Sequence, residues 1–277
     1  MNLNLLRGTA RWSAAVAGAT AGAAALLLLA TSATAATGPR PHSRKPTVVL
    51  VHGAFADSSS WNGVIERLRR EGYPVLAAAN PLRGLADDAA YVRSVLESVD
   101  GPIVLAGHSY GGSVISEAAD GNPNVKALVY VSSFQLEVGE STAELADKFP
   151  GNELGAALRE VPLPGGTGKD LYIKNEEFQR VFAADVPRGE TQLMAATQRP
   201  ITEAALSDKA TKAAWKTIAS WHLIARQDLA VPPESMRFMA KRANAHIVEV
   251  NASHAVAVSE PRAVADLIDK AGRTVTK

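Results

Sequence analysis

Short apolar runs alternate with stretches of helical periodicity along most of this chain. The run "PTVVLVHG" at 46–53 is rich in β-branched residues and ends at glycine, and "SSSWNGVIERLRREG" at 58–72 then places Trp61, Val64 and Leu68 at helical spacing. Strands that alternate with longer helices indicate βαβ units. Such units build a parallel sheet that is covered by helices on both faces. The pattern therefore favours an α/β fold.

The alternation continues to the carboxyl end with one interruption. Between about residues 134 and 214 the chain has short helical pieces and no run typical of a core strand. We predict a mostly parallel central sheet with helices on both faces and an inserted, mainly helical cap at 134–214. Strands are predicted at 46–53, 73–79, 101–107, 125–133, 217–226 and 245–253, and helices at 58–72, 87–99, 110–119, 232–243 and 260–272.

The amino terminus has the pattern of a secretory signal. Arg7 and Arg11 precede an uncharged run that contains "AAALLLLA", and the small residues Ala33 and Ala35 follow. A basic start, an apolar stretch and an A-x-A site are what signal peptidase reads, so cleavage is expected near Ala35 or Ala36. The alternative is an uncleaved anchor, but a run made mostly of Ala, Gly and Thr is a weak permanent span. The predicted divisions are a signal peptide at 1–36, a polar linker at 37–45 and a folded domain at 46–277.

Composition narrows the classes of partner. Lys plus Arg number 29 and Asp plus Glu number 28, so no net field favours nucleic acid or an anionic membrane. The chain has no cysteine, which excludes disulfides, thiolate nucleophiles and cysteine-ligated metals. We expect a secreted or periplasmic protein that acts on a small molecule, without a cofactor, a metal, nucleic acid or stable membrane insertion after cleavage.

A tight turn follows the third predicted strand. The stretch "IVLAGHSYGG" at 103–112 runs from strand to helix and contains G-x-S-x-G at 107–111. In this context the motif holds a serine at a strained turn, with its hydroxyl exposed above the edge of the sheet. The alternative is a glycine turn whose serine only caps a helix. The strand–turn–helix context favours Ser109 as a nucleophile.

A nucleophilic serine needs a base and a carboxylate, which in this kind of fold follow in the order serine, acid, histidine. Of the histidines after Ser109, His222 lies inside a predicted strand and His246 begins one, whereas His254 follows the last strand in "NASHAVAVSEP". We take His254 as the base. Asp228 in "LIARQDLAVPP" follows the strand before it, and we take it as the acid rather than as a helix cap.

The remaining requirement is a site for oxyanion charge. One donor should be the backbone N–H of the residue after the nucleophile, Tyr110. The other should come from the loop after the first strand, which begins at His52 in "HGAFADSSSW". The N–H of Ala54 is the preferred donor and that of Phe55 is the alternative. His52 itself is expected to hold the loop in place.

From about Pro46 onward these motifs resemble the α/β-hydrolase superfamily. They are most similar to a small cofactor-free branch that contains plant methylesterases and hydroxynitrile lyases. Four motifs carry this resemblance: an "HGA" loop, a "GHS-x-GG" elbow, an acid loop ending in "PP" and an "H…EP" histidine loop. The resemblance implies Ser109, Asp228 and His254 as a triad, with Ala54 and Tyr110 as oxyanion donors.

The branch contains two chemistries. The resemblance implies that a lyase would carry threonine at position 53 and lysine at position 255, where this chain has Gly53 and Ala255. Hydrolysis of small to medium, mainly apolar carboxylic esters through an acyl-enzyme is therefore expected. Acyl transfer, a lyase-like reaction and a non-catalytic receptor for a small ligand remain the alternatives. Most large apolar residues of the insertion are expected to pack it onto the domain, and the residues considered for an apolar pocket are Leu136, Phe149, Leu154, Leu158, Leu163, Leu171, Tyr172, Phe178 and Phe182.

Overall fold

The computed structural model describes residues 45–275. The predicted signal segment at 1–36 and the linker up to residue 44 lie outside these residues. Within 45–275 no helix has the length and apolar character needed to cross a membrane.

Six strands form one central sheet in which every pair of neighbours is parallel, so the predicted parallel sheet is confirmed. The sheet order is β2-β1-β3-β4-β8-β9. All residues of β3 are buried, as expected for an apolar run covered on both sides. The strands are β1 (Thr47–Val51), β2 (Val75–Ala78), β3 (Ile103–His108), β4 (Val125–Val131), β8 (Ser220–Ala225) and β9 (His246–Val250).

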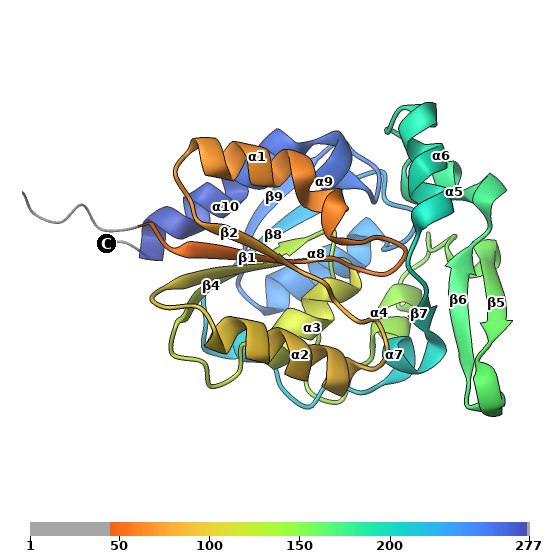
Figure 1. The fold of residues 1–277 in the computed structure, drawn as a ribbon, viewed down its shortest axis with the longest axis horizontal. Helices are drawn as coiled ribbons and strands as arrows, with labels where there is room; N and C mark the ends of the chain where they lie inside the picture. The colour runs from red at the N-terminus through yellow and green to blue at the C-terminus, as the bar shows by residue number, and fades with distance from the viewer. Residues whose placement is uncertain (1–44, 276–277) are drawn as a thin grey trace, which may run out of the picture. The chain divides into compact units, whose positions relative to one another are not determined.

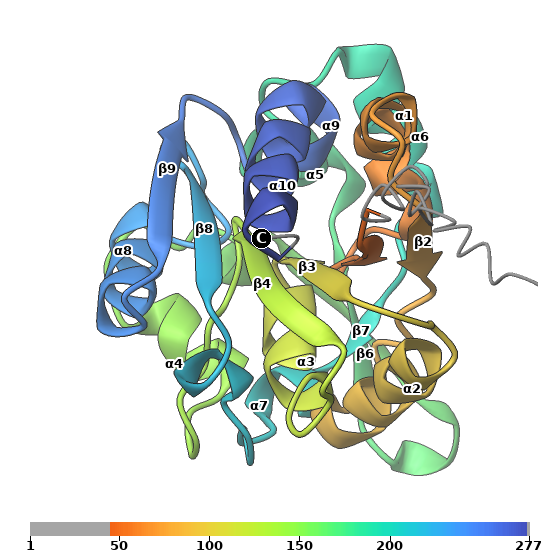
Figure 2. The same cartoon turned by 90° about the vertical axis from the view of Figure 1, so that its left-hand side faces the viewer.

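Helices cover both faces of this sheet (Figures 1 and 2). On one face, Leu68 and Ile268 pack into a core with the side chains of β1 and β3, and on the other Leu96 and Val114 do the same. The first face carries α1 (Asn62–Arg70), α9 (Val256–Ser259) and α10 (Pro261–Val275), and the second carries α2 (Leu85–Glu97), α3 (Tyr110–Ala118) and α8 (Pro233–Arg242). A short 3₁₀ turn η1 (Ser58–Trp61) precedes α1, and its first N–H groups are capped by Asp57.

The inserted segment contains strands that the sequence did not predict. Besides its helices it forms a three-stranded antiparallel sheet in the order β5-β6-β7. β5 and β6 are half exposed and carry charged residues, so they lack the apolar signature of a core strand. Figure 1 shows these strands together with α5 and α6 beyond one end of the central sheet. The elements are α4 (Thr142–Asp147), η2 (Gly155–Ala157), β5 (Leu158–Pro162), η3 (Pro164–Gly166), β6 (Lys169–Ile173), α5 (Asn175–Phe182), α6 (Arg188–Thr197), β7 (Ile201–Thr202), α7 (Glu203–Ser207) and η4 (Ala214–Lys216).

Candidate active site

Ser109 occupies the turn between β3 and α3 in a strained backbone conformation. Its φ is 53° and its ψ is −128°, a region that residues with a Cβ rarely adopt and that clusters at functional sites. Three donors hold the Ser109 carbonyl in place: the N–H of Gly112 at 2.9 Å, the Ser133 hydroxyl at 2.7 Å and the N–H of Phe134 at 3.3 Å. The turn is therefore supported by the start of α3 and by the loop after β4.

Two glycines make this turn sterically possible. A Cβ on Gly107 would lie 2.6 Å from the carbonyl oxygen of Gly111. A Cβ on Gly111 would in turn lie 2.5 Å from the carbonyl oxygen of Val51 in β1. Any side chain at either position would push α3 away from the sheet, so the glycines of the G-x-S-x-G motif are required by close backbone packing.

Asp228 and His254 meet beyond the carboxyl ends of β8 and β9. The Nδ1–H of His254 donates to Oδ2 of Asp228 at 2.7 Å, and both side chains are buried. The other carboxylate oxygen accepts the N–H groups of Ala230 and Val231, each at 2.8 Å. The carboxylate is thus fixed by its own loop. Because Nδ1 carries the proton, the Nε2 atom of His254 is left as the basic nitrogen.

Ser109 and His254 line the same cavity, which has a volume of about 160 Å³. Asp228 does not line this cavity itself but is hydrogen-bonded to His254, which does. Within residues 45–275 no hydrogen bond of 3.5 Å or less joins the Ser109 hydroxyl to His254. Catalytic hydrogen bonds often tighten only when substrate binds, so a shared cavity is the relevant geometry. We call this cavity the catalytic pocket, and its lining residues are Ala54, Phe55, Ser109, Tyr110, Phe134, Thr142, Ala143, Ala146, Asp147, Asn152, Leu154, Gly155, Leu158, Leu206, Ala230, Val231 and His254.

The histidine loop is fastened to the inserted segment. The N–H of Ala255 donates to the carbonyl of Phe182 at 2.8 Å, and the N–H of Ser253 donates to Asp185 at 3.0 Å. The Ser253 hydroxyl also donates to Asp185. The ring of Phe182 packs edge-on against His254, with 4.9 Å between ring centroids. Sequence reasoning did not assign these roles to Phe182 and Asp185, which follow no motif.

His108 also contacts the loop that contains His254. Its Nε2–H donates to the carbonyl oxygen of His254 at 2.9 Å, and the two imidazole centroids lie 4.7 Å apart. Burial lowers the pKa of His108 to about 3, so the ring is neutral at ordinary pH. The residue that precedes Ser109 therefore holds the backbone of His254.

The two preferred oxyanion donors are free amides. Within residues 45–275 the N–H groups of Ala54 and Tyr110 donate to no other group, and both residues line the catalytic pocket. The N–H of Phe55 instead donates to the carbonyl of Arg199 at 3.0 Å. This bond removes Phe55, the alternative donor considered from the sequence.

The side chain of Tyr110 is anchored by a buried carboxylate that sequence reasoning missed. The Tyr110 hydroxyl donates to Asp88 of α2 at 2.7 Å, and the N–H of Arg83 donates to the other oxygen at 3.0 Å. Both Tyr110 and Asp88 are buried. Burial raises the pKa of Asp88, whereas the hydrogen bonds from Arg83 and Tyr110 lower it. Asp88 follows Asp87 in the first turn of a helix, and two acidic residues at that position are typical of an exposed helix start, so the sequence did not indicate a buried carboxylate.

The other histidines among residues 45–275 are His52, His222 and His246, and none of them lines the catalytic pocket. His52 is buried, and its Nδ1–H donates to the carbonyl of Gly53 at 2.9 Å, in keeping with a role in holding the loop. Burial lowers the pKa of His52 to about 4. His222 is buried within β8 and stacks on Tyr130. His246 begins β9 and so lies at the opposite edge of the parallel sheet from Asp228. Within residues 45–275 no cluster of three or more metal-ligating side chains occurs.

The fold and the motif order define an α/β hydrolase, and the chain belongs to the alpha/beta hydrolase family, whose model matches residues 48–267. It is 30% identical over 253 residues to the alpha/beta hydrolase nvfD of Aspergillus novofumigatus, covering 82% of this chain and 96% of that protein. It is 26% identical to a pyrethroid hydrolase of Sphingobium wenxiniae, covering 80% and 85% of the two chains. The solved structure of the Arabidopsis methylesterase MES16 matches with a TM-score of 0.70 and 15% identity, over 83% of this chain and 99% of that one.

Proposed function

We propose that the protein hydrolyses carboxylic esters through an acyl-enzyme on Ser109. The observation that carries the proposal is the catalytic pocket itself. Ser109 on its strained turn, the free amides of Ala54 and Tyr110, and the imidazole held by Asp228 all meet there. Esterases and a pyrethroid hydrolase among the relatives support this reaction class.

In the acylation step the Ser109 Oγ attacks the carbonyl carbon of the ester while Nε2 of His254 accepts the hydroxyl proton. The carbonyl oxygen becomes an oxyanion that the N–H groups of Ala54 and Tyr110 stabilise, and each such donor is worth about 10²–10³ in rate. When the tetrahedral intermediate collapses, the C–O bond to the alcohol breaks and His254 returns the proton to the leaving alkoxide. Asp228 holds the imidazolium in place throughout.

Water then replaces the alcohol beside His254. Nε2 accepts a proton from this water, the hydroxide attacks the acyl carbon, and a second oxyanion forms at the same two amides. Collapse releases the carboxylic acid, and the proton on His254 returns to Ser109 Oγ. The two half-reactions use one set of groups, so the site needs no further residue.

The size and charge of the catalytic pocket indicate the substrate class. A cavity of about 160 Å³ is close to the ~150 Å³ that holds one benzene ring. The lining includes Leu154 and Leu158, but no lysine or arginine that could pair with a carboxylate. Asp147 is the charged residue of the lining among those described. We therefore propose uncharged esters whose acyl or alcohol group is about the size of one ring.

The nine large apolar residues considered for a pocket fall into different environments. Of the nine side chains considered for a pocket, Leu154 and Leu158 line the catalytic pocket. Phe178 and Phe182 are buried in the core instead. Leu136 and Leu171 are buried in the same core, so packing accounts for at least four of the nine.

The backbone at Gly53 favours hydrolysis over lyase chemistry. A Cβ at this position would lie 2.6 Å from the Ser109 Cβ and 2.8 Å from the His108 carbonyl oxygen. The threonine that the resemblance associates with a lyase would therefore collide with the nucleophile turn. Position 255 supports the same conclusion, because Ala255 has no charge to stabilise a departing cyanide.

A labelling experiment tests the proposal. A fluorophosphonate probe should modify the wild-type protein and leave Ser109→Ala unmodified, and the wild type should hydrolyse p-nitrophenyl acetate and butyrate. Ser132→Ala serves as the matched control, because Ser132 is a buried serine whose hydroxyl has no hydrogen-bond partner within the described residues. A correctly folded wild type that neither labels nor hydrolyses these esters would make the protein a small-ligand receptor. Cleavage of mandelonitrile would point to the lyase reaction.

We further propose that residues 1–36 export the protein and are removed near Ala35 or Ala36. The support is the basic, apolar and small-residue order of the sequence. Expression of the full chain in its host should place the protein outside the cytoplasm, with a new amino terminus that sequencing can read. An intact amino terminus in the membrane fraction would instead indicate an uncleaved anchor.

A further inference from the structure

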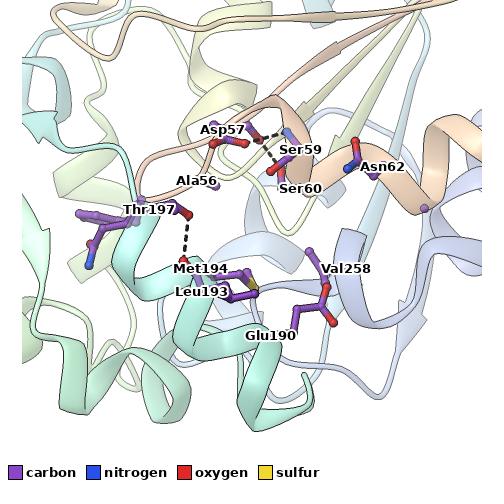
Figure 3. Close-up of a pocket in the computed structure, with 13 residues that line it drawn as sticks. Ala56, Asp57, Ser59, Ser60, Asn62, Glu190, Leu193, Met194, Thr197 and Val258 are labelled. Atoms are coloured by element: carbon purple, nitrogen blue, oxygen red, sulfur yellow. Dashed lines mark hydrogen bonds between the residues drawn. The ribbon is translucent and has the colours of Figure 1, made fainter.

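A second cavity lies close to the catalytic pocket and contains none of the triad. Its volume is about 330 Å³, and we call it the outer cavity. Figure 3 shows Leu193 and Met194 of α6 on one side, and Ser59 of η1 with its capping residue Asp57 on the other. The outer cavity is therefore bounded by the inserted segment and by the loop that supplies an oxyanion donor.

Phe55 borders both cavities. Among the described residues it alone lines both the catalytic pocket and the outer cavity. Its side chain is buried, with 2% of its surface exposed. Its ring meets Phe182 edge-on, with 6.4 Å between centroids. Phe55 is therefore a boundary residue of both the catalytic pocket and the outer cavity.

The backbone of Phe55 has a strained conformation. The φ of Phe55 is 60°, and a bulky residue at positive φ is strained. The N–H of Phe55 donates to the carbonyl of Arg199, so the strained loop is tied to the inserted segment. Strain of this kind persists only where surrounding contacts impose it, and it occurs preferentially at functional sites. The same loop presents the free N–H of Ala54 one residue earlier.

We infer that Phe55 sets the upper size limit of the ester. Its ring closes the catalytic pocket against the outer cavity, so the reacting ester is confined to the smaller of the two spaces. This inference rests on the proposed esterase function and adds the residue that determines chain-length specificity. On this inference, a substrate group that is longer than the catalytic pocket is stopped at Phe55, which also lines the larger outer cavity.

Removal of the ring should join the two cavities. We expect Phe55→Ala to raise the ratio of kcat/KM for p-nitrophenyl decanoate over p-nitrophenyl butyrate by at least ~10-fold, because each newly buried methylene contributes about fourfold. Phe55→Leu, which keeps an apolar side chain and loses the ring, should give a smaller rise. Phe55→Tyr keeps the ring and should leave the ratio unchanged.

A second substitution shows whether the longer chain enters the outer cavity. Leu193 lines that cavity and is 69% exposed, so Leu193→Trp adds bulk there with little effect on folding. Alone, it should leave the decanoate/butyrate ratio of the wild type unchanged. Combined with Phe55→Ala, it should remove most of the gain.

The outcomes separate this inference from the proposed function. If the wild type shows neither fluorophosphonate labelling nor ester hydrolysis, the proposed function fails. If the wild type and Phe55 variants are active and folded by thermal unfolding, an unchanged ratio in both Phe55→Ala and Phe55→Leu overturns the role of Phe55. A gain that survives Leu193→Trp overturns it as well, because the chain would then run elsewhere. If Phe55→Ala does not fold, Phe55→Leu alone decides.

Discussion

The hydrogen bond between Tyr110 and Asp88 should make a large and pH-dependent contribution to stability. Tyr110→Phe removes a single oxygen and leaves the ring in place. The hydroxyl donates to a carboxylate that is fully buried, at 2.7 Å. After the substitution Asp88 keeps the N–H of Arg83 as a donor to its other oxygen. One oxygen of a buried charge is then left without this partner.

The magnitude follows from the charge of the acceptor. A hydrogen bond to a charged group contributes about 1.5–3 kcal/mol, and both partners here are excluded from solvent. We therefore expect Tyr110→Phe to lower the free energy of unfolding by about 2 kcal/mol at neutral pH. For a domain of this size that corresponds to a fall in Tm of roughly 4–8 °C.

The loss should depend on pH in a defined direction. Burial raises the native pKa of Asp88, so its charge destabilises the folded state above that pKa, and the penalty disappears as pH falls through it. The Tyr110 hydroxyl lowers the same pKa, so the variant has a higher native pKa than the wild type. The difference in stability should be greatest at pH 7–8 and should shrink as the pH falls and Asp88 becomes protonated.

Urea unfolding of the purified protein at several pH values between 8 and 5 measures this difference. Tyr91→Phe is the matched control, because Tyr91 lies on the same helix as Asp88, is 40% exposed and makes no hydrogen bond within the described residues. It should change stability by less than ~0.5 kcal/mol. In an Asp88→Asn background the loss caused by Tyr110→Phe should fall to about 1 kcal/mol. A loss that grows toward acid pH, or that is unaffected by Asp88→Asn, would refute the reasoning.

Three further predictions concern the active site. Asp228→Asn should lower kcat for p-nitrophenyl butyrate by about 10⁴-fold with the fold retained, because the amide favours the wrong imidazole tautomer; a loss under tenfold contradicts the assigned role. Ser133→Ala removes one donor to the Ser109 carbonyl and should cost about 1 kcal/mol in urea unfolding, whereas Ser132→Ala should cost nothing measurable. Gly112→Ala would drive its Cβ into the Ser133 hydroxyl and should cost about 3 kcal/mol or more, so a variant with wild-type Tm would exclude the close packing described.

The elements and residues that could be predicted are those that local pattern determines. The six strands of the central sheet are apolar runs between turn residues, and each is present within a few residues of its predicted bounds. Ser109, Asp228 and His254 each follow such a strand, and parallel strands bring their carboxyl ends to one edge. The order of these residues along the chain was therefore enough to predict that Asp228 and His254 lie together. It was also enough to predict that Ser109 lies near them, and Ser109 and His254 both line the catalytic pocket.

Features that depend on contact between distant segments could not be predicted. Asp87 and Asp88 are neighbours in one helical turn, yet Asp88 is buried and accepts a hydrogen bond from Tyr110 of α3, a contact between segments that are apart in the sequence. β5 and β6 were missed because each is short and has two adjacent charged residues, Arg159 and Glu160 in β5 and Lys169 and Asp170 in β6, and the two become strands by pairing with each other. The strained φ of Phe55 likewise occurs in a loop whose N–H bonds to the distant Arg199.

The hydrogen bonds between the histidine loop and the insertion have a consequence for chimeric enzymes. They join Ser253 to Asp185 and Ala255 to Phe182. His254, the proposed general base, follows the last strand of the central sheet, but the residues on either side of it are hydrogen-bonded to residues of the insertion. Exchanging that insertion with one from a relative would therefore replace the residues that hold the loop of His254. It would also replace the insertion's share of the pocket lining, which we propose selects the ester. A graft that keeps Phe182 and Asp185 should preserve turnover while it alters substrate preference, and one that omits them should impair both.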